Sequence, residues 1–349
     1  MSSPVKVLVT GVGGRSVGHQ ILQALLLLGD TYTVVTSDTD AFSYGLYQAN
    51  RRYLVPRATD PTYVDAIRRL IAREHIDVVL PGTEAEIRTL ASHQTQLDCT
   101  LIVNPEELIH LSSNKGRLAQ WLSQNGFHTP RTVQGHDWQL LVREKGFPLV
   151  AKPAENTGGS RFVEILNSDA EVEHYLGVCP DPSGTLFQEY VGDSEGEYTV
   201  GVAVSHTGQI IDSIALRRKL AGLSLGVNRT IEGRQYALST GYSQGFITKH
   251  HRVQAVCEEL AVKLGARGPL NIQCRLVGND VYVFEVHPRF SGTTSIRAAV
   301  GFNEPDILIK DYLFQAPVRR VNYQTDMVAI RAFSNLLVPL AAFREVQSI

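Results

Sequence analysis

The chain has 349 residues, of which 43% are hydrophobic and 19% are charged, a balance typical of a soluble globular protein with two or three domains. Its formal net charge of -2 creates no field that would attract nucleic acid or an anionic membrane, so neither is expected as a partner. Four scattered cysteines without a C-x-x-C pair argue against a zinc site or a disulfide scaffold. With no signal-peptide pattern and no bilayer-spanning apolar run, a cytoplasmic location is expected.

Short apolar runs alternate with helical patterns over the first third of the chain. A helix is expected over residues 60–74, where Asp60 would be the N-cap and Pro61 the first helical residue. Alternation of strands and helices predicts a parallel sheet with both faces covered, ending near Asn104. The expected strands are residues 5–9, 32–38, 52–56, 77–82 and 100–104.

The pattern changes after residue 105. A short helix is expected within residues 111–126, with Ser112 or Ser113 as its cap, and a second follows at 167–176. Long strands then dominate, a helix is expected at 250–265, and a hairpin turns at Gly278-Asn279. This part is predicted to be an α+β region, built on the segments 147–166, 185–191, 197–205, 209–220 and 269–288.

The opening stretch "LVTGVGGRSVG" is similar to the dinucleotide fingerprint G-x-G-x-x-G. Gly11 and Gly13 fit, and Asp38 at the end of the second strand could contact a ribose, but Ser16 stands where the third glycine belongs. A tight turn into a helix N-terminus explains the same glycines, and we favour that interpretation over NAD binding.

A lysine and a glycine-rich loop form a more specific motif, "FPLVAKPAENTGGSR". Lys152 ends an apolar strand, and the loop that follows offers free backbone N–H groups, so together they predict a cover for phosphate groups. The motif is not a P-loop, which would require G-x-x-x-x-G-K-[ST] before a helix.

The segment "LFQEYVGDSEGEYTV" follows. The backbone of residues 188–191 could face the edge of an adenine, and Glu197 could accept hydrogen bonds from ribose hydroxyls. The competing interpretation is a solvated acidic turn.

The hairpin "VYVFEVHPRFSG" places Glu285 and His287 on one face, with Phe284 and Val286 on the other, because side chains alternate along a strand. If the turn is centred on Asn279, Gln273 lies opposite Glu285, whereas a one-residue slip would separate them. Such a carboxylate and amide oxygen suit Mg²⁺. Arg289 follows Pro288 and could bind an anion; the alternative is an edge hairpin with a solvated polar face.

In the order and spacing of these segments the chain resembles the ATP-grasp superfamily, particularly the synthetase halves of the carbamoyl phosphate synthase large subunit and stand-alone carboxylate-amine ligases. The resemblance covers about Lys6 to Phe314. It implies an α/β and α+β protein in which a Rossmann-like pre-ATP-grasp domain precedes a two-subdomain ATP-grasp fold. The expected boundaries are 1–105 for the first domain, 106–190 for a lid subdomain with a leading helix, and 191–349 for the C-terminal subdomain.

The resemblance also implies ligand-binding roles for individual residues. ATP phosphates would be bound by Lys115 and Lys152, under a lid formed by Gly158, Gly159 and Ser160; adenine by Glu189, Tyr190 and Val191; and ribose by Glu197. Mg²⁺, with Mn²⁺ as the alternative, would be bound by Gln273, Glu285 and His287. The family usually has Asn at position 287, and imidazole suits softer metals, so Asn271 is a candidate substitute.

The implied activity is an ATP-dependent ligase that converts a small-molecule carboxylate to an acyl phosphate and couples it to a small-molecule amine. Arg289 would contact the transferred phosphate, and Arg297 could bind the substrate carboxylate, with Glu84 at the edge of the first sheet. Arg217 and Lys219 alternate with Arg218 along a strand, so one or two of these cations, with Arg218 and Lys219 as the candidates, would point into the site; the competing interpretation is a solvated basic strand end. A non-ligating ATP-binding protein and an NAD-dependent oxidoreductase are the alternatives. A homodimer is the candidate assembly.

Overall fold

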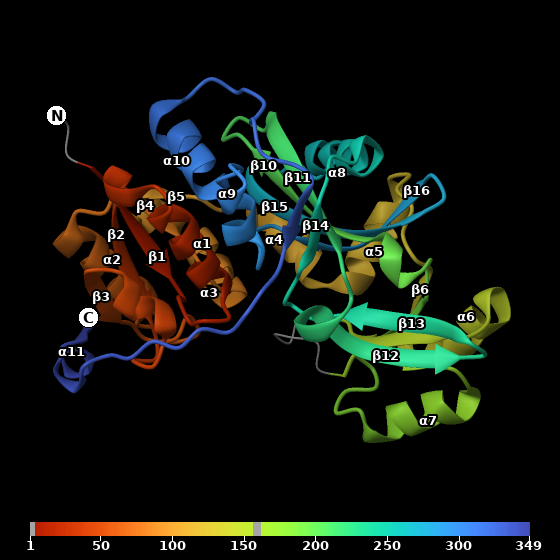
Figure 1. The fold of residues 1–349 in the computed structure, drawn as a ribbon. Helices are drawn as coiled ribbons and strands as arrows, with labels where there is room; N and C mark the ends of the chain where they lie inside the picture. Colours follow the sequence, from red (N-terminus) through yellow and green to blue (C-terminus); the bar gives the residue numbers. More distant parts are fainter. Residues whose placement is uncertain (1–3, 156–161) are drawn as a thin grey trace.

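The computed structural model describes residues 4–155 and 162–349, which it arranges around three larger sheets and a two-stranded sheet (Figure 1). The expected combination of an α/β unit and an α+β region is confirmed. The predicted lid residues Gly158, Gly159 and Ser160 lie outside the described residues. None of the helices in these ranges combines the length and apolar character needed to cross a bilayer.

The first sheet is parallel, with the strand order β18-β3-β2-β1-β4-β5. The strand order across the sheet reverses at β1, because β2 and β3 lie on one side of it and β4 and β5 on the other. The carboxyl ends of β1 and β4 therefore lie at the edge where open α/β sheets bind ligands. The five strands expected from the first third are all present, as β1 (Val5–Thr10), β2 (Tyr32–Asp38), β3 (Arg51–Leu54), β4 (Val78–Leu80) and β5 (Thr100–Leu101), with helices α1 (Val17–Leu26), α2 (Tyr63–Glu74) and α3 (Glu84–Ser92).

Two helices, α4 (Glu106–Ser113) and α5 (Lys115–Gln124), replace the one expected here. The cap of α5 is Asn114, whose side chain accepts a hydrogen bond from the Arg117 N–H at 3.0 Å, so the prediction of Ser112 or Ser113 as the cap is wrong. The Lys115 N–H donates to the Ala154 carbonyl at 2.8 Å. Because the helix is interrupted at Asn114, the start of α5 is hydrogen-bonded to the residue that follows β7 (Leu149–Pro153) of the second sheet.

The second sheet is antiparallel in the order β6-β9-β7-β8. Its strands are β6 (Thr132–Gln134), β7 (Leu149–Pro153), β8 (Glu164–Leu166) and β9 (Thr185–Glu189), and α6 (Trp138–Lys145) and α7 (Asp169–Val178) cover it through a shared apolar cluster. The sequence did not predict a hairpin of β12 (Leu225–Ile231) and β13 (Arg234–Ser239), which lies beside this sheet in Figure 1. Arg229 of this hairpin pairs with Glu171 of α7.

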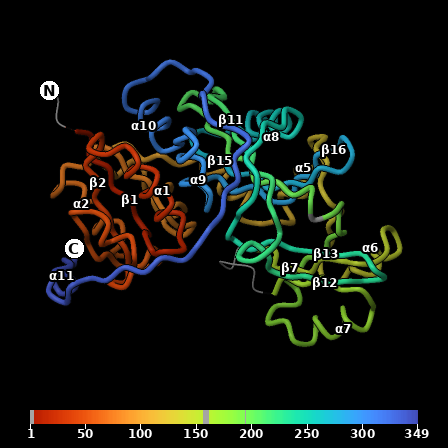
Figure 2. Tube along the Cα trace, in the orientation of Figure 1, coloured from red at the N-terminus to blue at the C-terminus, as the bar shows by residue number. Residues whose placement is uncertain are grey.

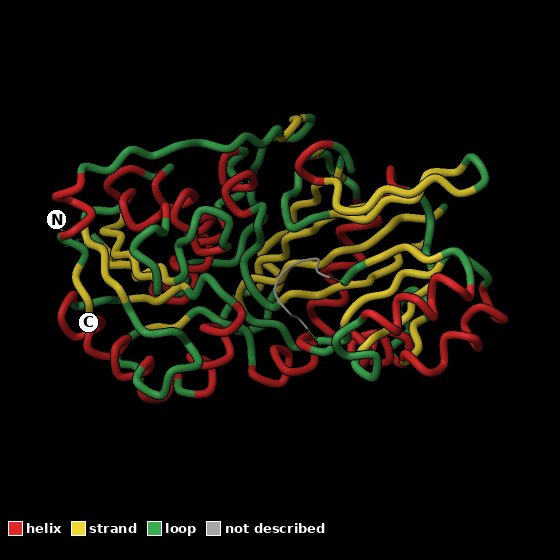
Figure 3. Tube along the Cα trace, turned by 90° about the horizontal axis from the view of Figure 1, so that it is seen from below, coloured by secondary structure: helices red, strands yellow, loops and turns green. Residues whose placement is uncertain are grey.

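The third sheet is also antiparallel, in the order β16-β15-β10-β11-β14-β17, and we call it the central sheet. Its strands are β10 (Glu197–Val204), β11 (Ile210–Arg218), β14 (Gly245–Ile247), β15 (Gly268–Val277), β16 (Asp280–His287) and β17 (Met327–Ala329). The expected helix is present as α8 (His251–Lys263), which packs on this sheet through a second apolar cluster. Seen from below, the second and central sheets fill the half of the molecule away from both termini (Figure 3).

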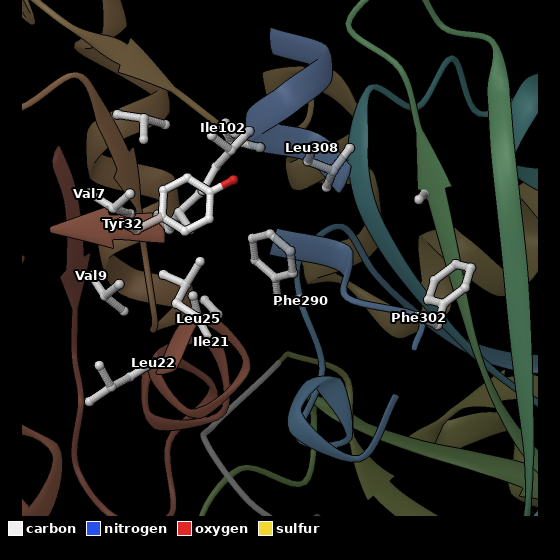
Figure 4. Close-up of a cluster of buried hydrophobic side chains, with 14 of the residues drawn as sticks. Val7, Val9, Ile21, Leu22, Leu25, Tyr32, Ile102, Phe290, Phe302 and Leu308 are labelled. Atoms are coloured by element: carbon white, nitrogen blue, oxygen red, sulfur yellow. The ribbon is translucent and has the colours of Figure 1, made fainter. Parts of the chain in front are cut away.

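The first unit is joined to the central sheet by a continuous apolar core. Val7 and Val9 of β1 and Leu22 of α1 share one cluster with Phe290 and Leu308, which follow β16 in sequence (Figure 4). The helices α9 (Thr294–Ala299) and α10 (Glu304–Phe314) stand between the two sheets. Because protein interiors are close-packed, this core holds the ligand edge of the first sheet in a fixed position relative to the central sheet.

A buried ion pair lies under the same helices. The Arg297 guanidinium pairs with Glu304 at 3.0 Å and donates to the Asn271 side chain at 2.7 Å, and both charged side chains are 1% exposed. A Cβ on Gly201 would lie 2.1 Å from this guanidinium, so glycine is required there. The prediction that Arg297 binds a substrate carboxylate is therefore not supported by its position, because its charge is already neutralised within the fold.

The C-terminal tail crosses the molecule. After β17 joins the edge of the central sheet, the chain runs to α11 (Leu340–Arg344) and then to β18 (Gln347–Ser348), which pairs with β3 of the first sheet. Figure 2 shows this path as a long blue tube that ends beside α2.

Arg297→Leu should lower the free energy of unfolding by about 3–5 kcal/mol, because it leaves the Glu304 carboxylate buried without its partner. Urea denaturation measures this difference. Lys310→Ala on α10 is the matched control, since it removes an exposed pair with Asp306 and should cost about 0.3–0.5 kcal/mol. Equal effects of the two variants would contradict the structural role of Arg297.

Candidate functional site

A cavity of about 420 Å³ lies where the first unit, the second sheet and the central sheet meet. It gathers most of the site residues expected from the sequence, which come from distant parts of the chain. Its lining includes Arg15, Glu84, Lys115, Lys152, Glu189, Tyr190, Val191, Glu197, Arg218, Asn271, Gln273, Glu285, His287 and Arg289.

Lys152 lies near the end of β7, and its side chain is almost fully buried in the cavity wall. Its ammonium donates to the Gln188 side-chain oxygen at 2.9 Å, and among the described residues no carboxylate lies within 4.0 Å of it. Burial lowers the pKa of Lys152 to about 8, although the charge of Glu285 opposes the shift. A buried cation held by a neutral amide is suited to accept an anion.

Lys115 approaches the same space from the first residue of α5. Its ammonium lies 3.9 Å from the Glu285 carboxylate, and its charge contributes to the lowered pKa of Lys152. The two lysines are thus close enough to repel each other, and Glu285 lies near both.

The residues expected at the adenine lie at the end of β9, which pairs with β7, and just beyond it. The Glu189 carboxylate accepts a hydrogen bond from the Arg131 N–H at 2.7 Å and pairs with Lys145 at 3.2 Å, so its side chain is already engaged. The guanidinium carbon of Arg275 lies over the Tyr190 ring, 4.5 Å from the ring centroid. Arg275 also donates to the Val191 carbonyl at 3.1 Å, which removes one of the main-chain acceptors expected to face the base.

Glu197 is buried between two arginines. Its carboxylate pairs with Arg275 at 2.9 Å and with Arg218 at 3.3 Å, and all three side chains are at most 6% exposed. Burial lowers the pKa of Arg218, which indicates that its charge is held at a cost. The interpretation of this segment as a solvated turn is wrong for Glu197, whose carboxylate lines the cavity in a charged network.

The hairpin of β15 and β16 pairs Gln273 with Glu285, as predicted for a turn centred on Asn279, and it also pairs Asn271 with His287. The turn at Gly278-Asn279 alone would have aligned Gln273 with Phe284, and a bulge after Gln273 restores the predicted pairing. Because of the bulge, Phe284 lines the cavity together with Glu285, so the prediction that Phe284 faces away is wrong.

A chain of alternating charges runs from this hairpin to the first sheet. His287 lies 3.2 Å from Glu285 and 3.5 Å from Glu84, the first residue of α3, and Arg289 binds Glu84 at 3.0 Å. Burial alone would raise the pKa of both carboxyls, but His287 and the neighbouring cations hold them well below their usual range. Burial and the charge of Arg289 act to lower the pKa of His287. The carboxylates of Glu285 and Glu84 have the larger effect, so the pKa of His287 is raised.

The oxygen atoms of Glu285 and Gln273 fit a divalent cation better than the imidazole of His287 does. The Gln273 oxygen accepts a hydrogen bond from Arg218 at 3.3 Å, and the His287 Nε2 is directed at Glu285. Within residues 4–155 and 162–349, no group of three or more His, Cys, Asp or Glu side chains is placed to hold a metal ion.

Two expected site residues lie outside the cavity. Lys219 pairs with Glu195 at 2.7 Å and is half-exposed, so of the basic run it is Arg218 that points inward. Arg297 is buried with Glu304, as described above. Gln188 as the partner of Lys152 and Arg275 as the partner of Glu197 were not predicted from the sequence. Gln188 is a diagonal neighbour of Lys152 across β7 and β9, a relation visible only once that strand pairing is known.

Comparison with known families matches two separate parts of the chain. Residues 7–102 match the family "PylC-like, N-terminal domain", and residues 185–335 match the family "ATP-grasp in the biosynthetic pathway with Ter operon". The carbamoyl phosphate synthase large chain of Thermus thermophilus is 25% identical over 320 residues, covering 86% of this chain and 30% of that protein. The chain thus spans between 17% and 30% of the length of the curated relatives it matches.

Solved structures share the fold. The N5-carboxyaminoimidazole ribonucleotide synthetase of Thermotoga maritima superposes with a TM-score of 0.61 at 17% identity, over 91% of this chain and 78% of that one. The L-amino acid ligase of Bacillus licheniformis gives 0.62 at 17% identity, over 92% and 78%. The biotin carboxylase domain of the Hydrogenobacter thermophilus 2-oxoglutarate carboxylase, solved with MgADP and bicarbonate, gives 0.64 at 16% identity, over 93% and 72%. The expected Rossmann-like first domain and ATP-grasp fold are confirmed, and the chain is similar to ATP-grasp proteins over both matched parts.

Proposed function

We propose that this protein is an ATP-dependent ligase that activates a small-molecule carboxylate as an acyl phosphate and couples it to an amine. One observation carries the proposal: Lys115, Lys152 and Arg289 converge with Glu285 on a single cavity that the first unit closes with Glu84. Cations gathered around an enclosed space suit phosphoryl transfer, which depends on positioning and charge neutralisation more than on covalent protein chemistry.

In this proposal the nucleotide lies between the second and central sheets. Lys115 and Lys152 bind its phosphates, and main-chain groups near Val191 face the base. Glu197, held between Arg275 and Arg218, faces the ribose. Mg²⁺ is the proposed metal, and Glu285 and Gln273 would hold it while phosphate and water supply further ligands. When bound, it would neutralise charge on the transferred phosphate.

The proposed reaction has two steps. An oxygen of the substrate carboxylate attacks the γ-phosphorus, the bond to the bridging oxygen breaks, and ADP and an acyl phosphate form. The amine nitrogen then attacks the acyl carbon, phosphate leaves, and the nitrogen loses a proton to solvent. Arg289 would stabilise the transferred phosphate, and its orientation is fixed by the two hydrogen bonds it donates to Glu84.

The opening glycine loop has a structural explanation that does not involve NAD. A Cβ on Gly18 would lie 2.2 Å from the Thr10 carbonyl, so this glycine allows α1 to pack closely on β1. Arg15 and Val17 of the same region line the shared cavity. We therefore assign this loop to the substrate side of the proposed ligase site.

Sustained turnover of ATP to ADP should require both a carboxylate and an amine, because the carboxylate alone leads only to the acyl phosphate and one ADP. A screen of amino acids and small carboxylates, alone and in pairs, tests this. Lys152→Met and Glu285→Gln should each lower turnover by at least about 10²-fold, because each removes a group that stabilises charge on the phosphates. Lys263→Met, which changes an exposed lysine on α8, should keep wild-type turnover.

Three outcomes would contradict the proposal. ATP binding without any stimulated ADP release would favour the non-ligating alternative. Stabilisation by NADH equal to that by ATP with Mg²⁺ in thermal melts would favour the oxidoreductase. Near-normal turnover of either site variant would remove that residue from the mechanism.

Affinity for a non-hydrolysable ATP analogue should fall with rising pH above about 8, approaching tenfold per pH unit, because only the protonated fraction of Lys152 attracts phosphate. Titration calorimetry from about pH 7 to pH 9.5 measures this, a range in which the phosphates are already ionised. Lys152→Arg is the matched control, since guanidinium stays charged throughout. A parallel loss of affinity in both proteins would assign the effect to another group.

A further inference from the structure

The C-terminal tail exposes an unusual amount of apolar surface. We define the tail strip as residues 327–340, and it holds seven of the seventeen exposed large apolar side chains in the described ranges. Ile330 is 83% exposed, Phe333 is 68% and Leu337 is 94%. Single exposed apolar residues are ordinary on a protein surface, but a contiguous run of them marks an interaction site.

The tail strip is also almost free of charge. Residues 327–343 contain one charged side chain, Arg331. Its Nε donates to the Ser243 carbonyl at 2.9 Å and its Nη2 donates to the Gly292 carbonyl, so the guanidinium is directed toward the cavity rim and away from the exposed surface. The outer surface of the strip is therefore uncharged along its length and mostly apolar, interrupted by the exposed polar residues Ser334 and Asn335.

The strip begins at an unprotected sheet edge. β17 pairs with β14 on one side, and among the described residues no strand pairs with its other side. Natural proteins commonly protect such an edge with charges, proline or a covering segment. Here Met327 and Val328 lie on the edge strand itself and are about half-exposed, so the edge is suited to pairing.

We propose that the tail strip is the interface of a homodimer in which two copies pack their strips against each other about a two-fold axis. The axis would pass near the middle of the strip, between Phe333 and Ser334, so that the β17 end of one strip faces the Leu340 end of the other and Ile330 faces Leu337 of the second copy. The inference goes beyond the proposed ligase activity and does not depend on it.

A second copy fits this surface better than a partner of different chemistry. An uncharged, apolar strip is complementary to itself, because two copies meet without bringing like charges together. The exposed fractions of the seven side chains sum to between four and five fully exposed large apolar side chains. At about 100 Å² of apolar area each, they would supply on the order of half of the roughly 800 Å² per partner that a standard stable interface buries, as its apolar centre.

The test is the mass of the full chain in solution, measured by light scattering after size exclusion over a dilution series. The wild type should have twice the 38.5 kDa mass of one chain. Ile330→Glu and Leu337→Glu should each shift it to a single chain, because each places charge at the centre of the interface. Both positions are so exposed that the folded monomer tolerates the change, which thermal melts followed by circular dichroism would verify.

Val262→Glu is the matched control, because Val262 is 56% exposed but lies on α8, outside the strip. It should stay dimeric. A wild type that is monomeric at every concentration would overturn the proposal, as would tail variants that remain dimeric. A monomer that instead binds phospholipid vesicles through the strip would also overturn it. None of these readouts uses ATP turnover, so the result is separate from that of the ligase test.

Discussion

The repulsion between cations that share one enclosed cavity is the constraint around which the site is organised. Lys115 and Lys152 both lie close to Glu285, and the buried ammonium of Lys152 has a pKa near 8 because water is largely excluded from it. At such distances charge interactions inside a protein are several times stronger than in water. The two carboxylates Glu285 and Glu84 hold the cations together, and a bound polyphosphate would relieve the remaining repulsion.

This charge balance requires three sheets to be fixed relative to one another. Lys152 comes from the second sheet, Glu285 from the central sheet and Glu84 from the first unit. The apolar core shared by β1, α1, α9 and α10 holds the first unit in place, and the buried Arg297–Glu304 pair stabilises the helices between the sheets. The network of charges in the cavity is thus positioned by packing well outside it.

Local patterns predicted much of the fold and those site residues whose geometry is local. Alternation along β16 placed Glu285 and His287 on one face, whereas the pairing of Gln273 with Glu285 also depends on a bulge, and the strand–helix alternation of the first third predicted the parallel sheet. Phe284 could not be placed, because a bulge breaks the alternation and nothing in the sequence marks it.

The residues that sequence reasoning missed or misplaced depend on partners that are distant or buried. Gln188 binds Lys152 only because β7 and β9 pair, and Arg275 binds Glu197 only because β15 and β10 pair. Arg297 was predicted to face the substrate, but it pairs with the buried Glu304. The local sequence around an arginine is the same whether its side chain faces a cleft or a buried carboxylate.

The tail shows how the same chain couples its surface to its interior. Arg331 lies within the exposed apolar strip, yet its guanidinium bonds to the carbonyls of Ser243 and Gly292, which line the cavity. Gly292 follows Arg289 by three residues, so the tail fixes the segment that presents the arginine expected to contact the transferred phosphate. A contact that orders the strip from outside would therefore also restrain that segment, since the guanidinium cannot move without breaking both hydrogen bonds.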